Sequence, residues 1–192
     1  MNRNSVAIRT LQDIDWENWE ADDPATLVFV VKDGRILLIR KKRGLGAGKI
    51  NGPGGKLDAG ESPAQCAVRE TLEETGVEAL NPQLAAVMRF VDLEDEDWLG
   101  YVFVAHRHRG KLRETVEAVP VWCARDEIPF DEMWDDDRYW LPRILAGEVL
   151  RGDFLFRAGT LIAHRLHPLG REEAVRANEH SNSINPELLS WD

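Results

Sequence analysis

The sequence predicts an α/β fold in which a mixed β-sheet packs against helices. Apolar, β-branched runs pair locally across short turns, which indicates antiparallel hairpins. Helical segments are inserted between some of these runs, but a regular strand–helix–strand repeat is missing, and this disfavours a doubly wound parallel sheet. With 192 residues, of which 43% are hydrophobic, the chain is long enough to bury one core of ordinary size.

The first element is a predicted hairpin. Apolar runs occupy 25–31 and 35–41, and Asp33-Gly34 between them is typical of a tight turn. A basic cluster, Arg-Lys-Lys-Arg at 40–43, ends the second run and offers cations for an anionic ligand. A glycine-rich loop follows it.

The next element is a predicted helix over 63–75. Ser62 is a favourable N-cap, Pro63 suits the first helical position, and Gln65 completes a capping box. Gly76 stands where a helix would end. We expect the apolar residues of this helix to pack on the sheet and its glutamates to point outward; these apolar residues are Ala64, Val68 and Leu72.

The later elements are three strands, a helix and a second hairpin. The strands are expected at 84–91, 98–108 and 118–124, the helix at 137–150 with Pro142 near its first turn, and the hairpin turn at Ala158-Gly159. The acidic residues 1–24 read as an N-terminal extension and the polar residues 169–192 as a C-terminal appendage. The expected domain therefore covers 25–168.

Charge and composition exclude several classes of protein. The net charge of −10 argues against stable nucleic-acid binding and against an anionic membrane surface. No apolar run has the length of a membrane span, and the N-terminus lacks a signal-peptide core. Two cysteines, Cys66 and Cys123, are too few for a disulfide framework, so we expect reduced thiols and a cytoplasmic protein.

Three glutamates, Glu70, Glu73 and Glu74, fall within five residues of the predicted helix. A solvated helix face would tolerate them, because each like-charge pair costs only a few tenths of a kcal/mol. Clustered carboxylates are also the hard oxygen ligands that Mg²⁺ prefers. Taken alone, the three glutamates leave both readings open.

The surrounding spacing resembles the signature of the Nudix hydrolases. Gly55 is followed after five residues by Glu61, and seven residues later by Arg-Glu-Thr-Leu-Glu-Glu-Thr-Gly-Val at 69–77. The one departure is Thr71, where the family usually has an aliphatic residue. The resemblance implies a Nudix-type α/β/α sandwich and hydrolysis of a nucleoside diphosphate linked to another group.

The resemblance also implies residue roles. The ligands of Mg²⁺, or of Mn²⁺ in its place, would be the Gly55 carbonyl and the carboxylates of Glu70, Glu73 and Glu74. Arg69 would orient these glutamates. Glu117 matches a later carboxylate that serves such enzymes as a ligand or general base, although an exposed strand glutamate remains an equal alternative.

Two further segments, at 41–56 and 126–140, are similar to those of family members that hydrolyse oxidised purine nucleoside triphosphates. The resemblance runs from about residue 26 to 167. It implies that Trp134 stacks on the purine and that Asp136 and Asp137 bond its Watson–Crick edge. Three further residues would contact the base or line the pocket: Asn51, Thr26 and Lys41.

The expected activity is therefore Mg²⁺-dependent conversion of a nucleoside triphosphate into a monophosphate and pyrophosphate. Oxidised purines such as 8-oxo-dGTP would be preferred, which would cleanse the nucleotide pool. Leu45, Ile50, Pro53 and Asp135 differ from the residues of those relatives, so we expect a differently shaped pocket. Alternatives are another diphosphate substrate (a dinucleoside polyphosphate, a nucleotide sugar or a capped RNA end) and a nucleotide sensor without turnover. The oligomeric state stays open.

Overall fold

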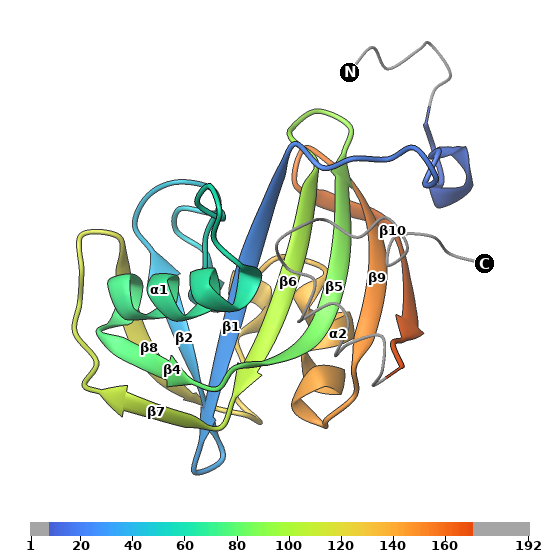
Figure 1. The fold of residues 1–192 in the computed structure, drawn as a ribbon. Coiled ribbons are helices and arrows are strands. Elements are labelled where there is room, and N and C mark those ends of the chain that lie inside the picture. Colours follow the sequence, from blue (N-terminus) through green and yellow to red (C-terminus); the bar gives the residue numbers. More distant parts are fainter. Residues whose placement is uncertain (1–7, 171–192) are drawn as a thin grey trace.

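The computed structural model describes residues 8–170 of the chain (Figure 1). A short 3-10 helix, η1 (Leu11–Asp13), precedes the strands, and a second one, η2 (Phe130–Glu132), precedes the last helix. The two α-helices are α1 (Pro63–Thr75) and α2 (Asp137–Leu145). The strands are β1 (Asp23–Lys32), β2 (Arg35–Lys41), β3 (Ile50–Asn51), β4 (Val77–Leu80), β5 (Gln83–Asp92), β6 (Trp98–Ala105), β7 (Arg107–Gly110), β8 (Ala118–Ala124), β9 (Leu150–Arg157) and β10 (Thr160–Pro168).

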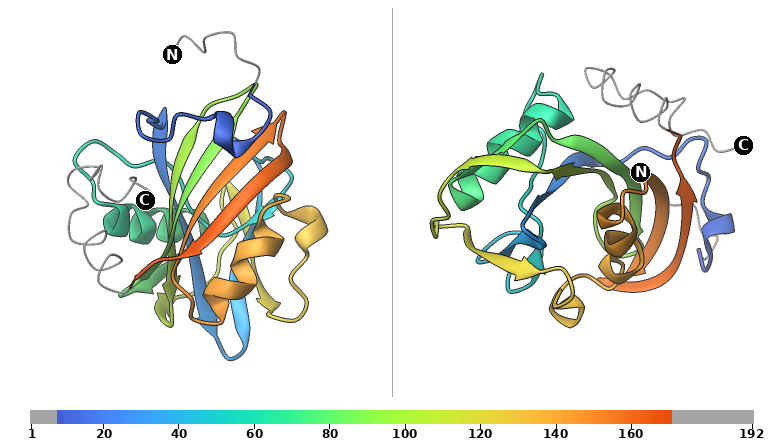
Figure 2. Two further views of the ribbon diagram at one scale, coloured as in Figure 1. Left: turned by 90° about the vertical axis from the view of Figure 1, so that its right-hand side faces the viewer. Right: turned by 90° about the horizontal axis from the view of Figure 1, so that it is seen from below.

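The large sheet is mixed, which confirms the predicted fold class. Its strand order is β10-β9-β5-β6-β1-β2-β3, and β8 also pairs with β2. β1 lies parallel to β6 and β5 lies parallel to β9, whereas the other pairs of this sheet are antiparallel. The sheet curves strongly, as the view from below in Figure 2 shows.

Two apolar cores lie on the two faces of the sheet. On one face, Ala67 of α1 packs with Val28 and Phe103, and the N-terminal residues Leu11 and Trp19 join the same cluster. On the other face, the α2 residues Trp140, Leu141 and Ile144 pack with residues of β1, β2, β5 and β6. The helices therefore cover opposite faces of the sheet, and the domain has three layers (Figures 1 and 2).

Local signals placed α1 and both hairpins correctly. Ser62 accepts the Gln65 N–H, the capping box is present, and Gly76 closes the helix in the left-handed conformation. At the first hairpin turn, Asp33 and Gly34 have φ of 48° and 73°. Positive φ at both turn residues gives the twist that a two-residue hairpin needs. Ala158 and Gly159 repeat this geometry with φ of 49° and 74°.

The expected orientation of α1 is confirmed for Ala64 and Glu73 but is wrong for Leu72 and Glu74. Leu72 is 42% exposed, whereas Glu74 is 1% exposed and belongs to the buried face together with Cys66 and Thr71. This face is polar but satisfied, because the Thr71 hydroxyl donates to the Ala67 carbonyl at 2.6 Å and the Glu74 carboxylate accepts the Gly54 N–H at 2.9 Å. When the buried face of a helix carries hydrogen-bonded polar residues, the spacing of its apolar residues does not reveal which face is buried.

Two later elements also differ from the prediction. The expected strand over 98–108 divides into β6 and β7, because β7 leaves the large sheet and pairs with β4 in a small sheet of its own. The expected helix over 137–150 ends at Leu145, since Gly147 adopts a φ of 94° and the chain then enters β9. Pro142 consequently lies inside α2 instead of in its first turn.

The two ends of the chain are covered only in part. Residues 150–168 form β9 and β10 and extend the large sheet, and most of the expected C-terminal appendage, 171–192, lies outside the described residues. Along residues 8–170 no helix combines the length and the apolar character needed to cross a membrane.

Candidate active site

A cavity of about 420 Å³ opens between β1, the second half of α1 and the segment that leads into α2. All site residues expected from the sequence line it except Arg69 and Glu73. Those that line it are Thr26, Lys41, Asn51, Gly55, Glu70, Glu74, Glu117, Trp134, Asp136 and Asp137. Segments far apart in the sequence therefore supply one site.

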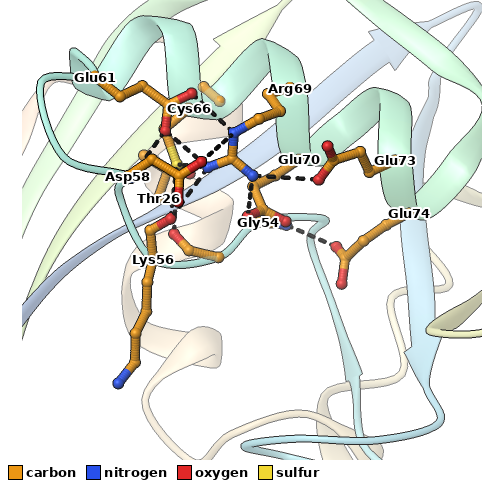
Figure 3. A network of polar contacts seen from close by, with 12 residues as sticks. Thr26, Gly54, Lys56, Asp58, Glu61, Cys66, Arg69, Glu70, Glu73 and Glu74 are labelled. Carbon is orange, nitrogen blue, oxygen red and sulfur yellow. Dashed lines mark hydrogen bonds and ion pairs between the residues drawn. The ribbon is translucent and has the colours of Figure 1, made fainter.

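We call the part of the cavity lined by Gly55, Glu70, Glu74 and Glu117 its acidic end. Arg69 does not line the cavity, but it binds the carboxylates of neighbouring glutamates (Figure 3). Its Nε and Nη2 donate to the Glu61 carboxylate at 2.9 and 2.7 Å, and its Nη1 donates to Glu70 at 2.7 Å and to Glu73 at 3.2 Å. The hydrogen bonds from Arg69 lower the pKa of Glu61. A bidentate pair of this kind fixes the guanidinium plane, so Glu61 orients Arg69 and Arg69 orients Glu70.

Glu74 is the most buried carboxylate of the acidic end. Besides the Gly54 N–H, its side chain meets the Lys41 Nζ at 3.6 Å. The pKa of Glu74 is raised to about 7, chiefly by burial and also by repulsion from Glu70 and Glu117. Burial also raises the pKa of Glu70, and the charge of Glu117 acts in the same direction. The three carboxylates therefore repel one another in one partly dry space.

Gly55 permits the close approach of backbone and carboxylate at this end. A Cβ at Gly55 would lie 2.5 Å from Oε1 of Glu70, so a larger residue would displace that carboxylate. The Gly55 carbonyl accepts the Thr26 N–H at 2.9 Å, which ties the loop to β1. The glycine of the signature thus has a direct steric reason.

The basic cluster at 40–43 is paired with acidic residues from three segments. Lys41 faces Glu74, and Arg43 forms an ion pair with Glu117. The other two pairs are Arg40 with Glu132 and Lys42 with Glu114. Lys41 and Arg43 therefore supply internal counter-charges to two carboxylates of the site, Glu74 and Glu117.

The donor set of the acidic end fits a hard divalent cation. Glu70, Glu74 and Glu117 offer carboxylate oxygens, and burial together with repulsion from neighbouring carboxylates raises the pKa of Glu70 and of Glu74. In the structure these carboxylates are engaged by Arg69, Lys41 and Arg43. Accordingly, no three His, Cys, Asp or Glu side chains of residues 8–170 already converge as a cation cage. Glu73 is exposed and does not line the cavity.

A second part of the cavity combines an aromatic ring with two buried carboxyl groups. Lys49 Nζ lies 4.8 Å from the centroid of the Trp134 ring. Asp136 accepts the Trp140 Nε1–H at 2.8 Å, and Asp137 accepts the backbone N–H of Trp134 at 3.0 Å. Burial raises the pKa of Asp136 to about 6 and raises that of Asp137 well above its usual value, with repulsion from Asp136 adding to the latter.

Sequence reasoning missed an aromatic wall of the cavity. Phe90, Trp98 and Phe156 line it, as do the acidic loop residues Asp95 and Glu96. Phe90 lies directly opposite Trp98 in the β5–β6 pair. Strand patterns in the sequence placed Phe90 and Trp98 in strands but gave no signal for the face of the sheet or for the pairing partner.

The chain belongs to the Nudix family: the NUDIX domain model matches residues 22–144. It is 39% identical to the oxidized purine nucleoside triphosphate hydrolase of Danio rerio over 143 residues, which cover 73% of this chain and 92% of that protein. The identity to the protein of the same name from Mus musculus is 36% over the same shares. Among solved structures, the MutT protein from Bacillus halodurans matches with a TM-score of 0.69 and 29% identity, covering 75% of this chain and 97% of that one. The protein is thus a Nudix hydrolase, and members of this family generally use a divalent metal ion and act on small-molecule nucleotides.

Proposed function

We propose that the protein is a Mg²⁺-dependent nucleoside triphosphate pyrophosphohydrolase that prefers oxidised purines such as 8-oxo-dGTP. The observation that carries the proposal is the pair Asp136–Asp137, buried beside Trp134 in the same cavity as the carboxylates of α1. The name and the coverage of the zebrafish and mouse relatives support it. We also propose the reducing cytoplasm as its compartment, since both cysteines are free.

At the acidic end, the candidate ligands of the cation are Gly55, Glu70, Glu73, Glu74 and Glu117, of which all but Glu73 line the cavity. A bound Mg²⁺, or Mn²⁺ in its place, would supply charge neutralisation and an acidified water. Arg69 holds Glu70 in place. Glu74 lines the cavity together with Glu70 and is held by the Gly54 N–H, and it is our candidate for the general base.

The base end is the part of the cavity around Trp134, Asp136 and Asp137. There the protonation states of the two aspartates decide which hydrogen bonds they make to the purine. Two adjacent buried carboxyls do not both ionise readily, because each charge raises the pKa of its neighbour. One neutral and one ionised carboxyl present a donor beside an acceptor. If the proton moves from one carboxyl to the other, the donor and the acceptor change places. The pair could then match the different hydrogen-bonding edges of 8-oxo-guanine and 2-oxo-adenine. Trp134 supplies the stacking surface, and Asn51, Thr26 and Lys41 line the cavity around it.

An activity panel tests the proposal. The purified protein is incubated with Mg²⁺ and 8-oxo-dGTP, 2-oxo-dATP, dGTP or ADP-ribose, and the monophosphate and pyrophosphate products are quantified. We expect kcat/KM to be highest for an oxidised purine triphosphate and to fall for the variants Asp136→Asn and Asp137→Asn. Asp33→Asn, an exposed change at a residue that does not line the cavity, is the matched control. Absence of turnover of every nucleoside triphosphate would overturn the proposal, and binding without turnover would identify a sensor.

One observation favours a second candidate substrate, a dinucleoside polyphosphate. The aromatic wall of Phe90, Trp98 and Phe156 offers a further surface for a ring in the same cavity. Lys56 Nζ lies 4.7 Å from the centroid of the Trp98 ring, in the same relation as Lys49 to Trp134. A higher kcat/KM for diadenosine tetraphosphate than for 8-oxo-dGTP would favour this candidate over the first.

A further inference from the structure

The N-terminal segment, residues 8–22, precedes β1 and is anchored on the face of the sheet opposite α2. The rings of Trp16 and Trp19 lie over the Arg89 guanidinium, with centroids 4.1 and 5.8 Å from its Cζ. Arg89 is fully buried on β5, and its Nε donates to Asp153 of β9 at 2.7 Å. The segment therefore holds a fixed place against β5 and β9.

The segment then runs past the loop between β5 and β6 (Figure 1) and forms hydrogen bonds with it. Trp19 Nε1 donates to Oδ2 of Asp97 at 3.1 Å. The backbone N–H of Asp97 donates to the Asp22 carboxylate at 2.9 Å, and the Asp22 N–H returns to the Asp97 carbonyl at 3.0 Å. Asp97 is thus fixed through its main chain and its side chain by residues that precede the sheet.

Asp97 in turn fixes Asp92, which reaches the base end of the cavity. The Asp92 N–H donates to Oδ1 of Asp97 at 3.3 Å. The Asp92 carboxylate accepts the backbone N–H groups of Ala158 and Gly159 at 3.1 and 3.0 Å. This β9–β10 turn lies against the purine-stacking ring, since a Cβ at Gly159 would be 3.4 Å from Cζ3 of Trp134.

We propose that the N-terminal segment is a positioning element for the purine subsite. Trp19, Asp97 and Asp92 form a continuous relay of hydrogen bonds that sets the β9–β10 turn and, through it, the place of Trp134. None of the three residues needs to touch the reacting phosphates. The inference rests on the proposed function for its effect on substrate, whereas the relay itself is a property of the free protein.

The variant Trp19→Phe tests the relay, because phenylalanine keeps an aromatic ring at this position, although a smaller one, and lacks the Nε1–H donor. We expect the KM for 8-oxo-dGTP to rise about threefold to tenfold, the factor that one lost hydrogen bond commonly produces, with kcat unchanged. In a Trp134→Ala background the same substitution changes nothing. Glu94→Gln, an exposed change in the same loop, is the control and leaves KM unaltered.

Backbone hydrogen exchange supplies a readout that needs no activity. We expect faster exchange in Trp19→Phe at the amides of Asp92, Ala158 and Gly159, with unchanged exchange in α1. If Trp19→Phe does not fold, Asp97→Asn serves in its place, because one acceptor oxygen then remains for two donors. Unchanged exchange at the turn, or a kcat loss without a KM change, overturns the relay. A wild-type protein inactive on all nucleotides overturns the proposed function instead and leaves the exchange test decisive for the relay.

Discussion

Replacing Asp136 with asparagine should stabilise the protein above neutral pH while weakening purine hydrolysis. Asp136 is buried and accepts the Trp140 indole N–H, an interaction that an asparagine oxygen preserves. Its pKa rises from the usual 3.8 to about 6 because burial disfavours the ionised form. The folded pKa is thus above the unfolded one. The contribution of Asp136 to the free energy of unfolding is fully present below pH 3.8 and is lost as the pH rises to about 6.

The size of the effect follows from this displacement. A change in pKa from 3.8 to about 6 corresponds to about 3 kcal/mol, because each unit is worth about 1.4 kcal/mol. The stability of Asp136→Asn minus that of the wild type should therefore be near zero at pH 4 and rise to at most about 3 kcal/mol at pH 8. In a domain of this size, each kcal/mol shifts Tm by about 2 to 4 °C.

Urea denaturation of both proteins at several pH values between 4 and 8 measures this difference directly. Asp33→Asn is the control, since it removes one carboxylate charge at an exposed turn that does not line the cavity and should leave the difference flat. A gap between Asp136→Asn and wild type that is the same at pH 4 and pH 8 would refute the reasoning. It would mean that the buried carboxyl does not change its ionisation on folding.

Three further results are expected. Glu74→Gln should lower turnover about 100-fold or more in a Mg²⁺ titration while the protein stays folded, because the amide oxygen still accepts the Gly54 N–H; undiminished turnover would exclude Glu74 as the base. Glu61→Gln should cost about 2 kcal/mol of unfolding free energy in urea, since it weakens the bidentate pair with Arg69, and an unchanged midpoint would contradict this. The thiol of Cys66, whose pKa burial raises to about 12, should resist a thiol reagent at pH 8 until the protein is denatured, and its early modification would contradict the burial.

Local chemistry explains what the sequence predicted well. Cap residues defined α1 at both ends, and two-residue turns defined both hairpins, because each depends on a few neighbouring residues. The spacing of Glu70, Glu74 and Arg69 belongs to one helix turn and its surroundings, so a linear signature could carry it. The grouping of Asp136 with Trp134 in the same cavity likewise follows from a short segment.

Long-range pairing explains what the sequence did not predict. The face of α1 was misjudged because Glu74 is buried and satisfied by Gly54, a partner twenty residues away in sequence. β4 and β7 are short and gain their stability from each other, so neither shows a strong pattern alone. The aromatic wall depends on the register that places Phe90 opposite Trp98, which no single strand reveals.

The paired basic cluster at 40–43 makes the site sensitive to salt concentration, whereas the two apolar cores are not. Its ion pairs tie β2 to the helix α1, to the loop before β8 and to η2, and the pairs of Arg40, Lys42 and Arg43 are substantially exposed. Dissolved salt weakens such pairs, whereas apolar packing is little affected at moderate ionic strength. Raising ionic strength should therefore loosen the relative placement of the two ends of the cavity at an almost constant melting temperature. Catalytic activity would then fall with rising salt concentration while the melting temperature stays nearly the same.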